Sequence, residues 1–142
     1  MYGSRPGAQE FIAKLQEKFL IGVWTAASPD YAKGVCNGLF AKKPEFIFTH
    51  TQCALSRVLT GLYSMETKTV KKLSKVNYSI DHILILDDTP FTYSKNYGNA
   101  VPVPEWMGDP SDDVLSKLGD YLITTFSEFN GSVRKIEKRN WL

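Results

Sequence analysis

The chain has 142 residues, of which 43% are hydrophobic and 23% are charged, and its formal net charge is +2. This size and composition are typical of one soluble domain with its own core, so we expect a single domain over residues 1–142. The weak net charge argues against nucleic acid as the main partner. The chain has no apolar run of the roughly 18 residues that a membrane span needs and no leader pattern, which predicts a cytoplasmic or nuclear protein.

The first half of the sequence predicts helices that alternate with short apolar strands. Pro6 and Gly7 indicate the start of a helix that ends near Lys18, and residues 19–24 form an apolar run of strand length. Ser28 is suited to cap a second helix, because Pro29 and Asp30 follow it in the first turn. We expect another strand over residues 46–49 and an irregular polar excursion over residues 50–68.

The second half continues the same alternation. We expect a short helix over residues 69–76, a buried strand over 82–86 and an extended segment over 99–103. The last helix is predicted over residues 111–126, with Ser111 as its cap. Short apolar strands between helices favour an α/β fold with a mainly parallel sheet and helices on both faces. In such sheets, ligands bind just beyond the carboxyl ends of the strands.

The stretch "DHILILDDTP", residues 81–90, places two adjacent carboxylates, Asp87 and Asp88, at the end of a buried strand. Successive strand side chains point to opposite faces, so at least one of the two lies where the strand has ended. Paired carboxylates suit Mg²⁺, Lys71 could neutralise phosphate oxygens, and the Thr25 hydroxyl could donate to them. From spacing alone, a capped turn and a solvated lysine remain the alternatives.

Seven segments, in order over residues 5–141, resemble the CTD-phosphatase-like family, also called NLI-interacting-factor-like phosphatases, of the haloacid dehalogenase superfamily. The segments are "RPGAQEF", "VWTAASPDYAKGV", "VKKLSKV", "HILILDDTP", "NYGNAVPV", "GDPSDDVL" and "VRKIEKRNW". The resemblance implies a haloacid-dehalogenase-like Rossmannoid fold. It also implies Mg²⁺-dependent removal of phosphate from phosphoserine or phosphothreonine in proteins.

The resemblance assigns roles to four residues. Thr25 of "WTAAS" matches the family threonine whose hydroxyl contacts the transferred phosphoryl group. Lys71 matches the lysine that neutralises phosphate and orients the nucleophile. Asp87 and Asp88 match the acidic motif that helps to bind Mg²⁺.

One family motif is not found in the sequence. These enzymes attack phosphate with the first aspartate of Asp-x-Asp-x-Thr and use the second as acid and base. That motif lies on the first, central strand, upstream of "RPG", whereas this sequence has no two aspartates spaced i, i+2. We therefore expect an N-terminally incomplete domain without that strand. Three explanations stay open: a fragment of an active phosphatase, an inactive binding or structural subunit, and a partner chain that supplies the strand.

The alternative class of function is a binding module. The tail over residues 133–142 carries four basic side chains, which could meet an acidic peptide or nucleic acid, although a solvated face is the plainer interpretation. His50, His82, Trp24 and Trp106 are expected to have structural roles. The sequence does not specify which phosphoprotein would be the substrate.

Overall fold

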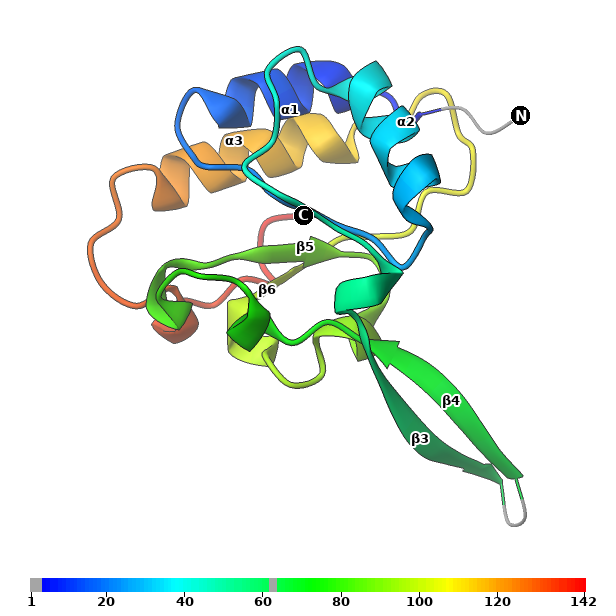
Figure 1. Cartoon of the computed structure of the whole chain (residues 1–142). Helices are drawn as coiled ribbons and strands as arrows, with labels where there is room; N and C mark the ends of the chain where they lie inside the picture. The colour runs from blue at the N-terminus through cyan, green and yellow to red at the C-terminus, as the bar shows by residue number, and fades with distance from the viewer. Residues whose placement is uncertain (1–3, 62–63) are drawn as a thin grey trace.

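The computed structural model describes residues 4–61 and 64–142 (Figure 1). Its α-helices are α1 (Ala8–Gln16), α2 (Pro29–Leu39) and α3 (Val114–Phe126). Helices α1 and α3 lie side by side on one face of the molecule, and α2 packs next to them (Figure 1). None of the described helices is long and apolar enough to cross a membrane.

Local sequence explains two of the helix starts. The Ser28 hydroxyl accepts a hydrogen bond from the backbone N–H of Tyr31, and Pro29 occupies the first helical position, as predicted. Gly7 precedes α1 with φ 80°, a backbone conformation that favours glycine. The predicted cap of the last helix is wrong, because Ser111 is bonded to the Asp109 carboxylate in the preceding turn and α3 begins three residues later.

Four short strands form two parallel pairs. Strand β1 (Val23–Trp24) pairs with β2 (Ile47–Phe48), and β5 (Ile85–Asp87) pairs with β6 (Ala100–Pro102). All sheets in the described parts of the chain are two-stranded. The α/β class is therefore right, whereas the mainly parallel Rossmannoid sheet, which we expected without its first central strand, stays a prediction, because the two parallel pairs are separate sheets.

The segment between the two parallel pairs differs from the prediction. Residues 50–68 are not irregular: after a 3-10 turn, β3 (Ala54–Gly61) and β4 (Ser64–Val70) form an antiparallel hairpin that projects from the body (Figure 1). The polar composition hid the strands, because both faces of a projecting hairpin are largely solvated. The helix expected over 69–76 is also wrong, since its first residues complete β4 and only Leu73–Lys75 form a 3-10 turn.

In the described parts of the chain, the core consists of two apolar clusters on opposite sides of β5 and β6. One joins α1, α3 and β6, with Val101 and Leu118 almost fully buried. The other contains Leu73, Ile85 and Ala100 and is covered by short 3-10 turns. Adjacent residues of β6 thus face different clusters, which is the pattern of a strand covered on both faces.

Candidate functional site

The carboxyl ends of the two parallel pairs meet at the base of the hairpin. The chain leaves the end of β2 and enters β3 at Ala54, which pairs with Val70 of β4. The next residue, Lys71, donates from Nζ to Asp87 Oδ2 at 2.7 Å, at the end of β5. Thr25 follows β1 directly, and its N–H donates to Phe48 O at the end of β2. The fold therefore brings the ends of β1 and β5 toward the same edge of the molecule.

Lys71 and Asp87 form a nearly buried ion pair. Their side chains are only 10% and 11% exposed. Asp87 Oδ1 also accepts from the Thr89 N–H at 2.9 Å, and the Lys71 N–H donates to Thr92 O at 2.7 Å. Both groups are thus held by the backbone as well as by each other. Removing one partner would leave an uncompensated charge out of water, which is strongly unfavourable.

The other two predicted residues, Thr25 and Asp88, directly follow strands β1 and β5. Thr25 is half-buried, and its Oγ1 accepts from the Ala27 N–H at 3.1 Å, so its hydroxyl proton is still able to donate to another group. Asp88 is exposed and directly follows the last residue of β5. One of the two carboxylates thus lies beyond the end of the strand, as expected from the alternation of strand side chains. Among the described residues, no hydrogen bond or ion pair joins Thr25 or Asp88 to Lys71.

Two residues that sequence reasoning missed complete the surroundings of Asp87. Thr89 links the two carboxylates, because its N–H donates to Asp87 and its hydroxyl donates to Asp88 Oδ1 at 3.2 Å. Tyr93 is buried, and burial together with the Asp87 charge raises the pKa of its phenol. The Thr-Pro turn in the sequence indicated a turn here, but it did not indicate that the turn ties the carboxylates together.

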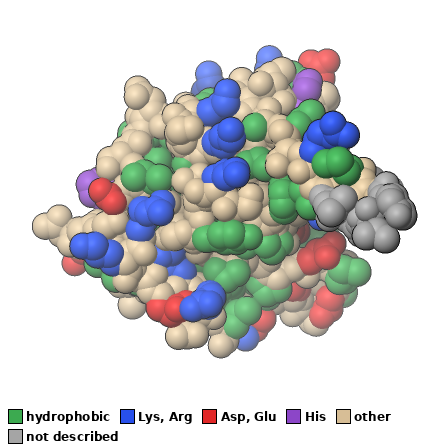
Figure 2. Space-filling model, turned by 90° about the horizontal axis from the view of Figure 1, so that it is seen from below, with side chains coloured by type: hydrophobic (Ala, Val, Ile, Leu, Met, Phe, Trp, Pro, Cys, Tyr) green, Lys and Arg blue, Asp and Glu red, His purple; other side chains and the backbone are tan. Residues whose placement is uncertain are grey.

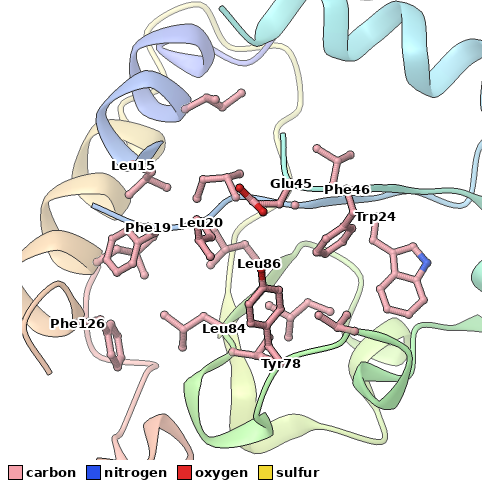
Figure 3. A pocket seen from close by; sticks show the side chains of 18 of the residues that line it. Leu15, Phe19, Leu20, Trp24, Glu45, Phe46, Tyr78, Leu84, Leu86 and Phe126 are labelled. Atoms are coloured by element: carbon pink, nitrogen blue, oxygen red, sulfur yellow. The ribbon is translucent and has the colours of Figure 1, made fainter. Parts of the chain in front are cut away.

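A cavity of about 770 Å³ opens beside this pair. Leu20, Phe46 and Trp24 lie on one side of it and Leu84 and Leu86 on the other (Figure 3). Further lining residues are Lys71 and Asp87 at the polar end and Leu15, Cys36, Leu122 and Phe126 near the helices. The candidate site is thus at the edge of a large apolar space.

Two of the residues that we expected to be structural, His50 and Trp106, make local polar contacts. His50 Nδ1 is 3.3 Å from Ala27 O, and the Trp106 indole donates to Asp109 O at 2.9 Å. Figure 2 shows several Lys and Arg side chains in a row in the middle of one face, among other polar and apolar side chains. A short row of this kind is usually a solvated face, so the solvated interpretation stays a prediction.

A sequence model of the NLI interacting factor-like phosphatase family matches residues 3–134. The CTD small phosphatase-like protein 1 of Caenorhabditis elegans is 36% identical over 121 residues, covering 80% of this chain and 22% of that protein. The CTD nuclear envelope phosphatase 1 of Xenopus laevis is 29% identical over 138 residues, covering 96% of this chain and 52% of that protein.

The nuclear envelope morphology protein 1 of Schizosaccharomyces pombe is 28% identical over 120 residues, covering 83% of this chain and 23% of that protein. This chain thus spans from about a quarter to about half the length of these relatives. The family match covers nearly the whole sequence and includes Thr25, Lys71, Asp87 and Asp88. The chain belongs to the NLI interacting factor-like phosphatase family.

Proposed function

We propose that this chain provides the phosphate- and metal-binding part of a Mg²⁺-dependent phosphatase site that acts on phosphoserine or phosphothreonine in proteins. The observation that carries the proposal is the buried pair of Lys71 with Asp87 at the carboxyl end of β5. Relatives named as CTD phosphatases support the choice of a protein substrate. Two relatives named for the nuclear envelope favour the nuclear over the cytoplasmic alternative.

The polar groups of the site have complementary roles in phosphoryl transfer. The Lys71 ammonium, which contacts Asp87, would also contact a phosphate oxygen. Its positive charge would stabilise the negative charge of the transferring group. The Thr25 hydroxyl has its proton free to donate to the same phosphoryl group. Neither residue is a substitute for a carboxylate nucleophile, because both stabilise charge without forming the covalent intermediate.

The residues at the end of β5 fit a magnesium ion by the chemistry of their donors. Mg²⁺ takes hard oxygen ligands and is usually held by one or two carboxylates, with waters and substrate phosphate in the remaining positions. Asp88 is exposed, and the Thr89 contacts hold it next to Asp87. The described residues contain no group of three or more His, Cys, Asp or Glu side chains placed to hold a metal. Asp87 and Asp88 would hold the ion, which supplies Lewis-acid stabilisation of phosphate charge when bound.

The aspartyl nucleophile and its acid/base partner would come from polypeptide other than these 142 residues, since the sequence has no Asp-x-Asp pair. An inactive phosphatase-like binding or structural subunit is the second candidate function, and the same missing pair favours it. The Lys71–Asp87 pair supports the catalytic alternative, because an ion pair this buried is rarely better for stability than apolar side chains of similar size.

Hydrolysis of para-nitrophenyl phosphate and of a phosphoserine peptide tests this proposal. Residues 1–142 alone should show no Mg²⁺-dependent turnover above a blank. The same chain mixed with a peptide that bears an apolar strand ending in Asp-x-Asp-x-Thr should gain turnover, and Asn in place of the first aspartate should abolish it. Robust turnover by the chain alone would show that the nucleophile lies elsewhere. Bound peptide without turnover would favour the inactive subunit.

A further inference from the structure

His50 lies just beyond the carboxyl end of β2, at the same edge of the molecule as Thr25. Strands β1 and β2 are parallel, with Trp24 opposite Phe48, so the two strands end at the same level. The chain then turns at once, because His50–Gln52 form a 3-10 turn at the base of the projecting hairpin (Figure 1). Ligands of parallel sheets bind just beyond such strand ends. The side chain of His50 is exposed at this position.

Ala27 connects the imidazole of His50 to the hydroxyl of Thr25. The Ala27 N–H donates to Thr25 Oγ1 at 3.1 Å, and Ala27 O lies 3.3 Å from His50 Nδ1. Because both contacts are made by one residue, the hydroxyl oxygen and Nδ1 are at most roughly 10 Å apart along this path. The two side chains are therefore neighbours at this edge.

The contact with Ala27 O determines which ring nitrogen of His50 carries a proton. A carbonyl oxygen only accepts hydrogen bonds, so Nδ1 must be the donor, and Nε2 keeps its lone pair in the neutral ring. Among the residues that the structure describes, Nε2 takes part in no hydrogen bond or ion pair. The ring is thus held by one nitrogen, and the other nitrogen is available to a ligand.

The imidazole is not needed to hold the turn in which it lies. The His50 N–H already donates to Ala27 O at 3.1 Å, so the backbone makes the same connection. Within the turn, the Thr49 N–H donates to Gln52 Oε1 at 2.6 Å, and the Cys53 N–H donates to His50 O at 3.1 Å. The main effect of the bond between Nδ1 and Ala27 O is therefore to orient Nε2.

The charges at this edge favour a further cationic donor for phosphate. The positive charge of Lys71 is already compensated by Asp87, to which its ammonium is bonded. A phosphate monoester of serine or threonine carries about −1.5 to −2 charge at pH 7. Hydrogen bonds from charged donors are stronger than those from neutral ones. An imidazolium ring donates from both nitrogens, and a nearby anion favours this charged form.

We propose that His50 is a further phosphate-binding residue of this site. Its imidazolium donates from Nε2 to a phosphate oxygen, while Nδ1 stays bonded to Ala27 O. The phosphate then accepts hydrogen bonds from His50 as well as from Thr25 and Lys71. This role deepens the proposed function, and it rests on that function for the identity of the ligand as a phosphate monoester. It goes beyond the structural role that the sequence led us to expect for His50.

Nitrogen NMR of the histidine rings tests this role without any turnover. The chain has two histidines, and the second, His82, precedes β5 at the opposite end from Asp87, so it is an internal control. In residues 1–142 at pH 7.5, the neutral ring of His50 should carry its proton on Nδ1. Saturating O-phosphoserine with Mg²⁺ should increase the fraction of His50 rings that are protonated on Nε2. The ring of His82 should not respond, and serine should have no effect on either ring.

Substitutions of His50 separate a phosphate contact from a structural role. The amide nitrogen of Asn matches the position of Nδ1, so His50→Asn keeps a donor for Ala27 O and removes the outer nitrogen. This variant should bind phosphoserine about tenfold more weakly, as expected for loss of one hydrogen bond to a charged group, with an unchanged circular dichroism spectrum. His50→Gln, whose amide nitrogen matches Nε2, should lose less affinity. His82→Asn should bind phosphoserine like the wild type.

The same titrations distinguish failure of this role from failure of the proposed function. Unchanged affinity in His50→Asn, or a His50 ring that ignores phosphoserine while the side-chain signals of Lys71 shift, would overturn the role and leave the proposed function intact. A response of His50 without one of Lys71 would support the phosphate contact and count against the proposed function. Absence of any response from both residues would overturn both.

Discussion

Two apolar regions of this molecule have similar composition and opposite exposure. On the side of β6 and α3, Val101 and Leu118 are 0% and 1% exposed. On the side of β1 and β5, Leu20 and Leu86 are 66% and 36% exposed. Around Val101 and Leu118 the first region is closed by elements of the chain itself, although Leu122 and Phe126 of the same cluster also line the cavity. The second region borders that cavity beside the candidate site (Figure 3).

The difference teaches that an apolar run in the sequence predicts burial without saying what covers it. Residues 19–24 and 82–86 are equally apolar, yet only short parts of them are strands, β1 and β5, each with one partner. A central strand of a parallel sheet needs a neighbour on each side and a layer on each face. In the described parts of the chain, β1 and β5 each have a neighbouring strand on one edge only.

The largest expected effect concerns catalysis at Lys71, which lines the cavity beside the second region. In the chain complemented with the Asp-x-Asp-x-Thr peptide, Lys71→Ala should lower kcat by roughly 10²–10³-fold, the range seen for loss of one group that stabilises transition-state charge. Added Mg²⁺ should not restore it. Lys72→Ala, an exposed neighbour, should leave kcat unchanged. Steady-state kinetics distinguishes these outcomes, and equal effects of the two substitutions would contradict the assigned role.

Substitution of Asp88 tests the proposed Mg²⁺ site. In the complemented chain, Asp88→Ala should lower activity in a way that raised Mg²⁺ partly restores, because Mg²⁺ binding depends on the number of carboxylate ligands. A titration of activity against Mg²⁺ measures the shift. An Asp88→Ala variant with normal activity at every Mg²⁺ concentration would remove this residue from the proposed metal site.

A stability comparison separates the closed region from the open one. Leu118→Ala should destabilise the isolated chain by about 2–5 kcal/mol, the range for a buried leucine that leaves a cavity. Leu20→Ala should change stability by less than about 0.5 kcal/mol, as expected for an exposed position. Urea denaturation followed by circular dichroism measures both. With the strand peptide bound, the cost of Leu20→Ala should rise, and no change on binding would argue that the peptide lies elsewhere.

The smallest effect is expected next to the start of α3, where Arg5 donates two hydrogen bonds to the Asp112 carboxylate, at 2.9 and 3.1 Å. The hydrogen bond from Arg5 lowers the pKa of the Asp112 carboxyl. The Arg5–Asp112 interaction therefore contributes fully to the free energy of unfolding above the unfolded-state pKa of Asp112, about 3.9. This contribution is lost as the pH falls through the lower pKa that Asp112 has in the folded state. The stability difference between the wild type and Asp112→Asn should be constant near neutral pH and shrink below about pH 4. A difference that grows as the pH falls would contradict this.

Local signals in the sequence predicted much of the fold and part of the site. The cap at Ser28, the end of β5 at Asp87 and the proximity of Lys71 to Asp87 follow from capping chemistry, strand alternation and family resemblance. The hairpin was missed because its strands do not alternate between apolar and polar residues. Charged side chains such as Arg57 on β3 and Glu66 on β4 are exposed to solvent. Thr89 was missed because its role depends on how the turn folds back onto two carboxylates.

Amide hydrogen exchange along β1 tests the central claim, that this strand has an open edge awaiting a partner. Val23 and Thr25 donate to β2, whereas Trp24 faces the cavity. In the chain alone, the Trp24 N–H should exchange at least tenfold faster than the N–H groups of its two neighbours. Addition of the apolar strand peptide should remove that difference. Equal protection of all three N–H groups in the chain alone, or a Trp24 rate unaffected by saturating peptide, would contradict the account.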